Sequence, residues 1–293
     1  MDFAVTILEQ GLIYGILALG VYITYKILDF PDLTVDGSFP LGAAITAALI
    51  TRGMNPYLTL PVSFGAGALA GVCTGLIHVR GKVRDLLSGI IMMTALWTVN
   101  LYIAGTANVP LFSQKTIFKN DMVGRIVPEG LAPYTTLLII FILAMICKVL
   151  LDLYMKTKSG YLLRAAGDNE VVVTALAKDQ GNVKILGLSI ANGLVSLAGC
   201  IFAQEERVFE ISMGTGAIVI GLASVIIGSS MLKKVSILKG TSAVMIGAVI
   251  YKACVAVAIR NFEPQSMKLI TAVLFLVILI FSMERKSKVK KNA

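Results

Sequence analysis

Three carboxylates stand close together in a short stretch rich in residues that break helices. Asp29, Asp32 and Asp36 are spaced three and four residues apart around Pro31, between two apolar runs. Carboxylates at this density can bind a cation or receive the amine of a substrate, but Asp is also a common helix cap and loop residue. The ligand order of an EF-hand is absent from the sequence, which leaves calcium as the weakest interpretation. The other two stay open.

The rest of the sequence offers no catalytic or nucleotide-binding motif. The segment nearest to a phosphate-binding loop, Gly75–Val83, has five residues between its glycines where four are needed, and no Ser or Thr follows Lys82. His78 is the single histidine, so neither a Ser-His-Asp set nor a histidine metal centre can be built. The cysteines stand singly in four apolar runs, at Cys73, Cys147, Cys200 and Cys254. We predict a chain that is not an enzyme and has no metal site.

Three polar residues fall inside apolar runs, where polar side chains are costly. Lys252 lies in the middle of one run, and Asn100 and Asn192 lie in two others. A lysine buried in a membrane span is a functional candidate by default, but pairing with a neighbouring helix or snorkelling also explains it. The asparagines are expected to bond across helices or to line a polar pathway.

The composition indicates an integral membrane protein. Hydrophobic residues make up 57% of the 293 residues, charged residues only 15%, and the mean hydropathy is +0.84. The apolar runs are long enough to cross a bilayer, which takes about 20 residues of helix. We predict an all-α, polytopic transmembrane bundle of about nine spans (eight to ten), forming one domain over residues 1–293. The expected spans are 7–27, 37–51, 58–78, 86–104, 134–153, 184–203, 216–232, 240–259 and 268–283.

The distribution of Lys and Arg predicts the orientation. Seventeen of the 26 basic residues fall in the odd-numbered connections and the C-terminal tail, and seven fall on the opposite side. Because basic residues concentrate on the cytoplasmic side, we expect the N-terminus outside, the C-terminus inside and residues 284–293 as a basic cytoplasmic tail. The net charge of +9 is then a signal of topology, and it does not indicate a nucleic-acid partner.

Two connections are long enough to carry function. Residues 105–133 form a polar segment on the expected outer side. Residues 156–183, on the expected cytoplasmic side, have apolar residues near helical spacing and so predict a short amphipathic helix. Three acids in this segment (Asp168, Glu170 and Asp179) disfavour adhesion to anionic lipid. Docking to a partner protein is therefore the preferred role, with a lipid-surface helix as the alternative.

Two irregular elements precede short spans and run in opposite directions. The stretch Leu28–Pro40 contains Pro31 and Pro40 and is expected not to be regular helix, while span 37–51 is too short for a full crossing. The stretch Gln204–Gly216 is the counterpart in the second half. Together they predict inverted-repeat-like halves with broken helices around a central site. A plain cytoplasmic loop over residues 29–37 is the competing interpretation.

These two elements supply the expected translocation pathway. Glycine lets the backbone line a narrow channel, hydroxyls offer the weak contacts that a passing zwitterion needs, and an aromatic ring can act as a gate. The predicted pathway residues are Asp36, Gly37, Ser38, Phe39, Ser212, Gly214, Thr215 and Gly216. Three arginines at outer span ends go against the usual charge bias, and we expect Arg52, Arg207 and Arg260 to dock acidic residues of a binding protein, with lipid headgroups as the alternative.

Three segments together resemble a known family. Ser159–Asn169 (SGYLLRAAGDN) is similar to the cytoplasmic loop of permeases in the branched-chain amino-acid and ribose class of bacterial ABC importers, and Leu197–Gly199 matches the end of the span that follows that loop. Leu28–Phe39 and Gly216–Gly228 resemble the branch of that class assigned to tryptophan or tyrosine uptake. One departure is Ala177-Lys178, where many relatives have Gly-Ile, and it leaves the end of the coupling segment undefined.

The resemblance implies a subunit of a larger assembly in the bacterial plasma (inner) membrane. It implies a homodimer of permeases, separate ATPase subunits that use ATP and Mg on the cytoplasmic face, and an extracytoplasmic protein that delivers a small solute, such as an aromatic amino acid. This chain itself would hold no cofactor. The ATPase-coupling residues would be Gly160, Leu163, Arg164, Ala165, Ala166, Gly167 and Asn169. The alternative is a secondary transporter or channel, which usually needs intramembrane carboxylates; Glu9 and Asp152 are expected near span ends.

Overall fold

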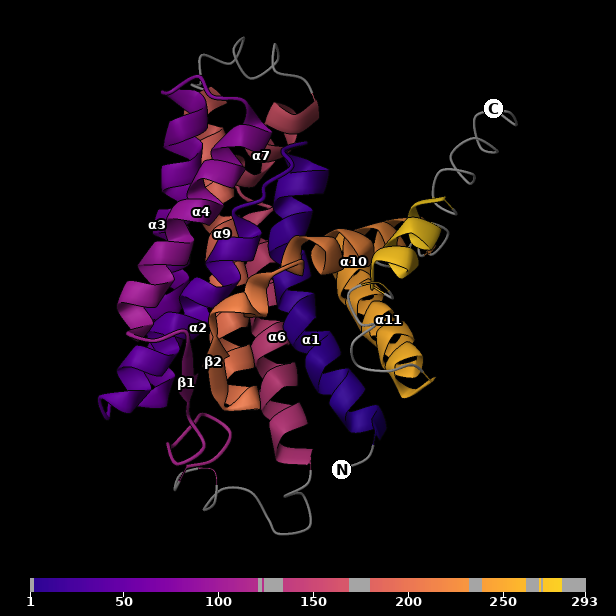
Figure 1. Ribbon diagram of the computed structural model, residues 1–293. Coiled ribbons are helices and arrows are strands. Elements are labelled where there is room, and N and C mark those ends of the chain that lie inside the picture. Colours follow the sequence, from indigo (N-terminus) through magenta and orange to yellow (C-terminus); the bar gives the residue numbers. More distant parts are fainter. Residues whose placement is uncertain are drawn as a thin grey trace.

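A computed structural model of the chain describes residues 3–120, 123, 134–168, 180–231, 239–261, 269 and 271–280. Over these residues the chain is a helical bundle (Figure 1). Seven helical stretches are long and apolar enough to cross a bilayer: Phe3–Ile27, Pro56–Val79, Asp85–Ala104, Thr135–Tyr154, Gln180–Glu206, Ile211–Ser230 and Gly240–Ala258. Two further apolar helices, Val35–Thr51 and Thr271–Ile280, are shorter, so seven of the nine expected spans reach full crossing length within the described residues.

The helices fall into a main bundle and a smaller group beside it (Figure 1). In the main bundle α1 (Phe3–Val21), α2 (Val35–Thr51), α3 (Thr59–Val79), α4 (Asp85–Ala104), α6 (Thr135–Tyr154) and α9 (Gln180–Glu206) run side by side, and α1 continues as the π-helix η1 (Tyr22–Ile27). The smaller group is α10 (Ala217–Met231) and α11 (Gly240–Asn261), which pack on α1. Helix α7 (Lys158–Asp168) lies at one end of the bundle, here the α7 end.

Two short strands and the N-terminus lie at the opposite end, here the strand end (Figure 1). Strand β1 (Asn108–Pro110) pairs antiparallel with β2 (Val208–Glu210), with Val109 opposite Phe209. The expected all-α fold is confirmed, and the described residues add to it only this ribbon of two three-residue strands. It forms because β1 and β2 each continue from the end of a helix, α4 and α9, and each extended backbone satisfies the other's hydrogen-bonding groups.

Helix α2 is the centre of the bundle although it is the shortest helix there. Thirteen of its 17 residues are buried. Its small residues allow backbone contact with α9: a Cβ on Gly42 would lie 1.8 Å from the carbonyl oxygen of Ser196, and one on Gly199 would lie 1.9 Å from that of Phe39. A helix that is mostly enclosed by protein need not match the bilayer thickness, because few of its side chains are available to lipid.

Helix α2 begins at Val35 and contains Pro40, whereas the stretch through Pro40 was expected to be irregular. The non-helical part is only the segment before Val35, where Asp29 has a left-handed φ of 52°. Pro40 cannot donate to the carbonyl of Asp36, which is the partner its position in the helix would require. That carbonyl is instead covered by Gly214, whose added Cβ would lie 2.2 Å from it. Tertiary contact thus accommodates the proline.

Candidate functional site

The two elements expected to line a pathway meet in the structure. The carboxylate of Asp36 accepts a hydrogen bond from the backbone N–H of Gly216 at 3.0 Å and another from that of Ile218 at 2.8 Å. Asp36 therefore caps the N-terminus of α10, although it belongs to α2. Gly216 has a φ of 83°, a conformation that favours glycine, and this turn aims its N–H at the carboxylate.

A buried polar network holds the segment before α2. Asn192 of α9 donates to the Asp32 carboxylate at 2.7 Å and accepts from the Ser38 hydroxyl at 2.7 Å. Asp32 also accepts from the backbone N–H of Thr34 at 2.9 Å, and the Thr34 hydroxyl lies 2.9 Å from that of Thr74. All five residues are at most 1% exposed. Asp32 lies between the first candidate span and α2, and burial raises the pKa of its carboxyl while its hydrogen bonds oppose that rise.

This burial is incompatible with an ordinary solvated loop over residues 29–37. Asp32, Thr34 and Val35 are each at most 1% exposed, and only Asp29 and Pro31 are exposed. Asn192 bonds across helices, as expected, and Asn100 donates to the carbonyl of Gly37 at 3.1 Å. The three aspartates thus act as a helix cap at Asp36, a buried network acceptor at Asp32 and an exposed turn residue at Asp29.

The remaining pathway candidates are divided between the interior and the surface. Phe39 is fully buried and stacks on Tyr14, with ring centroids 5.8 Å apart; Phe202 contacts both rings. Ser212 and Thr215 are exposed, and the Ser212 hydroxyl bonds to Glu210. The structure therefore brings Asp36 together with Gly214 and Gly216 at a junction between α2 and α10, whereas Gly37, Ser38 and Phe39 face α4, α9 and α1.

Helix α7 carries most of the expected coupling residues, but they face in two directions. Leu163 and Ala166 are buried, and so is Gly160, which lies inside α7 next to the end of α6 and not at the end of a preceding helix. Arg164 is exposed and Ala165 is partly exposed; Asn169 lies outside the described residues.

The buried face of α7 packs on Ile27 and Leu28, at the start of the segment that leads into α2. Leu163 and Leu28 both lie against Gly187 of α9, and a Cβ on Gly167 would lie 1.8 Å from the carbonyl oxygen of Ile27. Leu163 and Ala166 therefore do not belong to an outward-facing surface, because α7 uses its apolar face on its own bundle, whereas Ala165 and Arg164 remain accessible.

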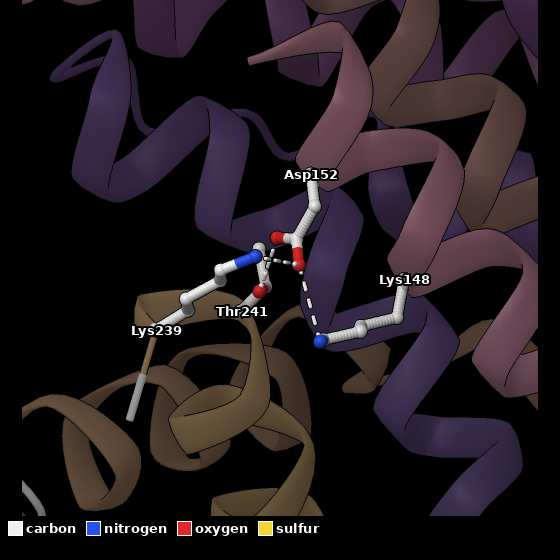
Figure 2. A network of polar contacts seen from close by, with 4 residues as sticks. All are labelled: Lys148, Asp152, Lys239 and Thr241. Atoms are coloured by element: carbon white, nitrogen blue, oxygen red, sulfur yellow. Dashed lines mark hydrogen bonds and ion pairs between the residues drawn. The ribbon is translucent and has the colours of Figure 1, made fainter. Parts of the chain in front are cut away.

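A polar network at the α7 end joins α6 to α11 (Figure 2). Asp152 accepts from the Thr241 hydroxyl at 2.6 Å and pairs with Lys148 at 3.1 Å and Lys239 at 3.4 Å. Figure 2 shows the three side chains converging on this one carboxylate. A 290 Å³ cavity beside the network is also lined by Arg164 of α7. The network links α6 to the start of α11, in the second half of the chain.

The three arginines expected to dock a binding protein follow or end helices α2, α9 and α11. Arg52 and Arg260 are exposed, and Arg207 is partly exposed with a left-handed φ of 56°. Arg260 lies over the ring of Phe3, at 5.9 Å, so it is close to the N-terminus. Helices α2 and α9 end at the strand end of the bundle, opposite α7 (Figure 1).

Sequence reasoning missed one group of charged residues near the strand end. Glu9, expected near a span end, is only 2% exposed. Lys252 donates to the side chain of Gln10 at 3.4 Å and lies 3.9 Å from the ring centroid of Tyr14; Gln10 in turn donates to Glu206 at 3.0 Å. The signal in the sequence was the pair Glu205-Glu206 at the end of an apolar run. Among the described residues, no group of acids, histidines or cysteines has the arrangement of a metal site.

Comparisons with known proteins identify relatives over the whole chain. The family model described as the branched-chain amino acid transport system permease component matches residues 3–283. The tyrosine transport system permease protein of Clostridioides difficile (strain R20291) is 41% identical over 294 aligned positions, which cover 100% of this chain and 96% of that protein.

More distant relatives are named for other substrates. The ribose import permease protein of Escherichia coli (strain K12) is 26% identical over 231 residues, covering 77% of this chain and 68% of its own length. A probable branched-chain amino acid transport permease of Methanocaldococcus jannaschii is 28% identical over 229 residues, which cover 73% of this chain and 70% of that protein. No solved structure gives a significant match.

Proposed function

The chain belongs to the family of branched-chain amino acid transport system permease components, and from this premise we propose that it translocates tyrosine or a related aromatic amino acid. Members of this family are the non-enzymatic, multi-pass membrane subunits of ABC importers in bacteria, and a partner ATPase uses the ATP. The observation that carries the substrate proposal is the 41% identity, over the full chain, to a tyrosine permease.

The proposed topology extends the seven candidate spans to nine. Helix α2 and the Thr271–Ile280 helix complete the count, with α2 crossing only the protein-enclosed centre of the bundle. The α7 end and the tail 284–293 face the cytoplasm, and the strand end faces outside. The Leu28–Thr34 segment before α2 and the 211–216 segment before α10 support an inverted-repeat relation, because each leads into an apolar helix and the starts of those two helices meet at Asp36.

The proposed pathway passes the junction between α2 and α10 near the axis of a homodimer. Gly214 packs on the backbone of Asp36, and Ser212 and Thr215 are exposed beside it. Phe39, fully buried on Tyr14, is proposed as the closed gate. The pathway therefore opens only if α10 moves relative to α2, which would break the Asp36 cap.

The proposed contact with the ATPase is the outer face of α7. Arg164 is exposed there and can pair with a carboxylate of the partner, and Asn169 follows in the same segment. The residues that pack inward, Leu163 and Gly167 among them, transmit movement of α7 to Ile27 and Leu28. At the opposite end, Arg52, Arg207 and Arg260 are proposed to dock an acidic surface of the extracytoplasmic binding protein.

Transport by the reconstituted importer tests the substrate proposal. The permease is placed in proteoliposomes with its ATPase, and its binding protein is added outside with labelled L-tyrosine, L-leucine or D-ribose. ATP-dependent uptake of tyrosine above leucine and ribose is expected. Uptake of ribose alone would contradict the proposal, and uptake driven by an ion gradient without ATP would favour a secondary carrier. The mass of the purified permease tests the homodimer.

A further inference from the structure

Charged residues from three distant parts of the chain meet near the strand end of the bundle. Glu9 comes from α1, Glu205 and Glu206 end α9, and Lys252 lies in α11. Glu205 is within electrostatic range of the other three. Because α9 and α11 both pack on α1, this charge cluster lies between helices and beneath the strand end.

The cluster holds more negative than positive charge, and its single lysine is already engaged. Lys252 donates to Gln10 and lies over the Tyr14 ring. One oxygen of Glu9 and one of Glu205 are buried without a hydrogen-bond partner. Glu9 is only 2% exposed. An uncompensated buried carboxylate is unfavourable, so these groups need a proton or a cation.

The surroundings indicate what kind of cation fits. The described residues do not offer a metal-ligand arrangement at this place. Tyr14, which contacts Lys252, also belongs to the aromatic group formed with Phe39 and Phe202. Carboxylates, one lysine and aromatic rings within one region match the ammonium, carboxylate and side chain of an aromatic amino acid. Glu206 is exposed, so the cluster is reachable from the surface.

We propose that Glu9 and Glu205 receive the ammonium group of the transported amino acid, and that this cluster is the first binding point inside the permease. When the Lys252 amine breaks its hydrogen bond to Gln10, it can pair with the carboxylate of the substrate. The ring of the substrate would meet Tyr14 and Phe202 next to the proposed gate, Phe39. This inference rests on the proposed function, because it requires an amino-acid substrate.

Glutamine substitutions test whether Glu9 and Glu205 bind an ammonium group as carboxylates or are simply protonated. Glu9→Gln, Glu205→Gln and the double variant keep the shape of a protonated carboxyl but cannot carry the negative charge. Uptake of labelled L-tyrosine by the reconstituted importer is expected to fall about tenfold in each single variant, with partial recovery in Glu205→Asp. Asp85→Asn, at a partly exposed acid outside the cluster, is the matched control and should transport normally.

Thermal unfolding of the purified variants distinguishes binding from structure. Removing an unpartnered buried charge should leave the unfolding temperature unchanged or raise it, while uptake falls. Wild-type uptake in the double Gln variant would overturn the inference and leave the proposed function intact. A loss of uptake that follows a loss of stability would also overturn it, because the acids would then be structural. A wild-type importer that carries no amino acid would refute the proposed function and this inference together.

Discussion

The Asp36 carboxylate caps a helix to which it does not belong. It accepts from two N–H groups at the start of α10, at Gly216 and Ile218, and so links the two halves of the chain through one side chain. A helix N-terminus has unpaired donors and a partial positive charge, and both favour a carboxylate at this place.

Replacing Asp36 tests the importance of this cap. Asp36→Ala leaves two part-buried donors without an acceptor, so we expect the free energy of unfolding to fall by about 2 kcal/mol and transport to be lost. Asp36→Asn keeps one acceptor oxygen, so it should retain part of the stability and part of the transport activity. The measurement is denaturant unfolding in detergent together with uptake. Ser229→Ala, at an exposed position of α10, is the control and should change stability by less than about 0.5 kcal/mol. Equal stability of Asp36→Ala and wild type would contradict the capping role.

Residue types alone could identify Asp36 and Asn192 as candidates but could not assign their roles. Whether Asp36 caps its own helix, another helix or a ligand depends on the position of Gly216, far away in the sequence. The charge cluster was missed for the same reason. Glu9 lies near the start of an apolar run, and only the packing of α1 against the rest of the bundle makes it buried.

At the scale of elements, α7 is joined directly to the segment that precedes α2. Gly167 packs on the carbonyl of Ile27, and Leu163 and Leu28 share a contact with Gly187. The amphipathic pattern predicted a helix at this place correctly. The pattern could not decide whether the apolar face of α7 packs on a partner protein or on the chain's own bundle, because either surface would bury that face equally well.

A methyl group at Gly167 should weaken this link. In Gly167→Ala the added Cβ would lie 1.8 Å from the Ile27 carbonyl oxygen, so α7 must shift. We expect a loss of about 2 kcal/mol in stability and a lower ratio of substrate transported to ATP hydrolysed, with the ATPase still bound. Gly65→Ala in α3, where nothing lies within 4 Å of the added Cβ, is the matched control. Normal transport per ATP in Gly167→Ala would argue against transmission through this contact.

In the Asp152 network, the hydroxyl bond from Thr241 should contribute more to stability than the ion pair with Lys239. Thr241→Val removes the 2.6 Å bond to a carboxylate that is only 12% exposed, so a loss of about 1.5 kcal/mol is expected. Lys239→Ala should cost less than about 1 kcal/mol, because that lysine is 59% exposed and water screens its ion pair. Unfolding of both variants at low and high salt tests this order. Only the effect of Lys239→Ala should shrink as salt rises.

At the scale of the whole molecule, burial is very uneven. Helices α2 and α9 are enclosed, whereas α4 and α6 expose large apolar side chains such as Trp97 and Leu150. Exposed apolar helices on the outside of a bundle suit contact with lipid or with a second copy.

The number and length of most helices could be predicted from the sequence, because about twenty consecutive apolar residues have few alternatives to a membrane-spanning helix. The pairing of β1 with β2 could not, since three-residue strands carry no distinguishable pattern.

State-dependent labelling tests whether the junction of α2 and α10 opens during transport. Cysteines are introduced at Val35 and Ser38, which are buried, and at the exposed Asp29 as a control, after the four native cysteines are replaced. With the junction closed, a small water-soluble maleimide should label position 29 but neither of the buried positions. If substrate passes between the two halves, trapping the importer with ATP or in the nucleotide-free state should expose position 38 in one state only, because the Asp36 cap and the Phe39 stack must separate. Constant protection of position 38 in every state would place the pathway elsewhere, and constant labelling of positions 35 and 38 would contradict the closed junction itself.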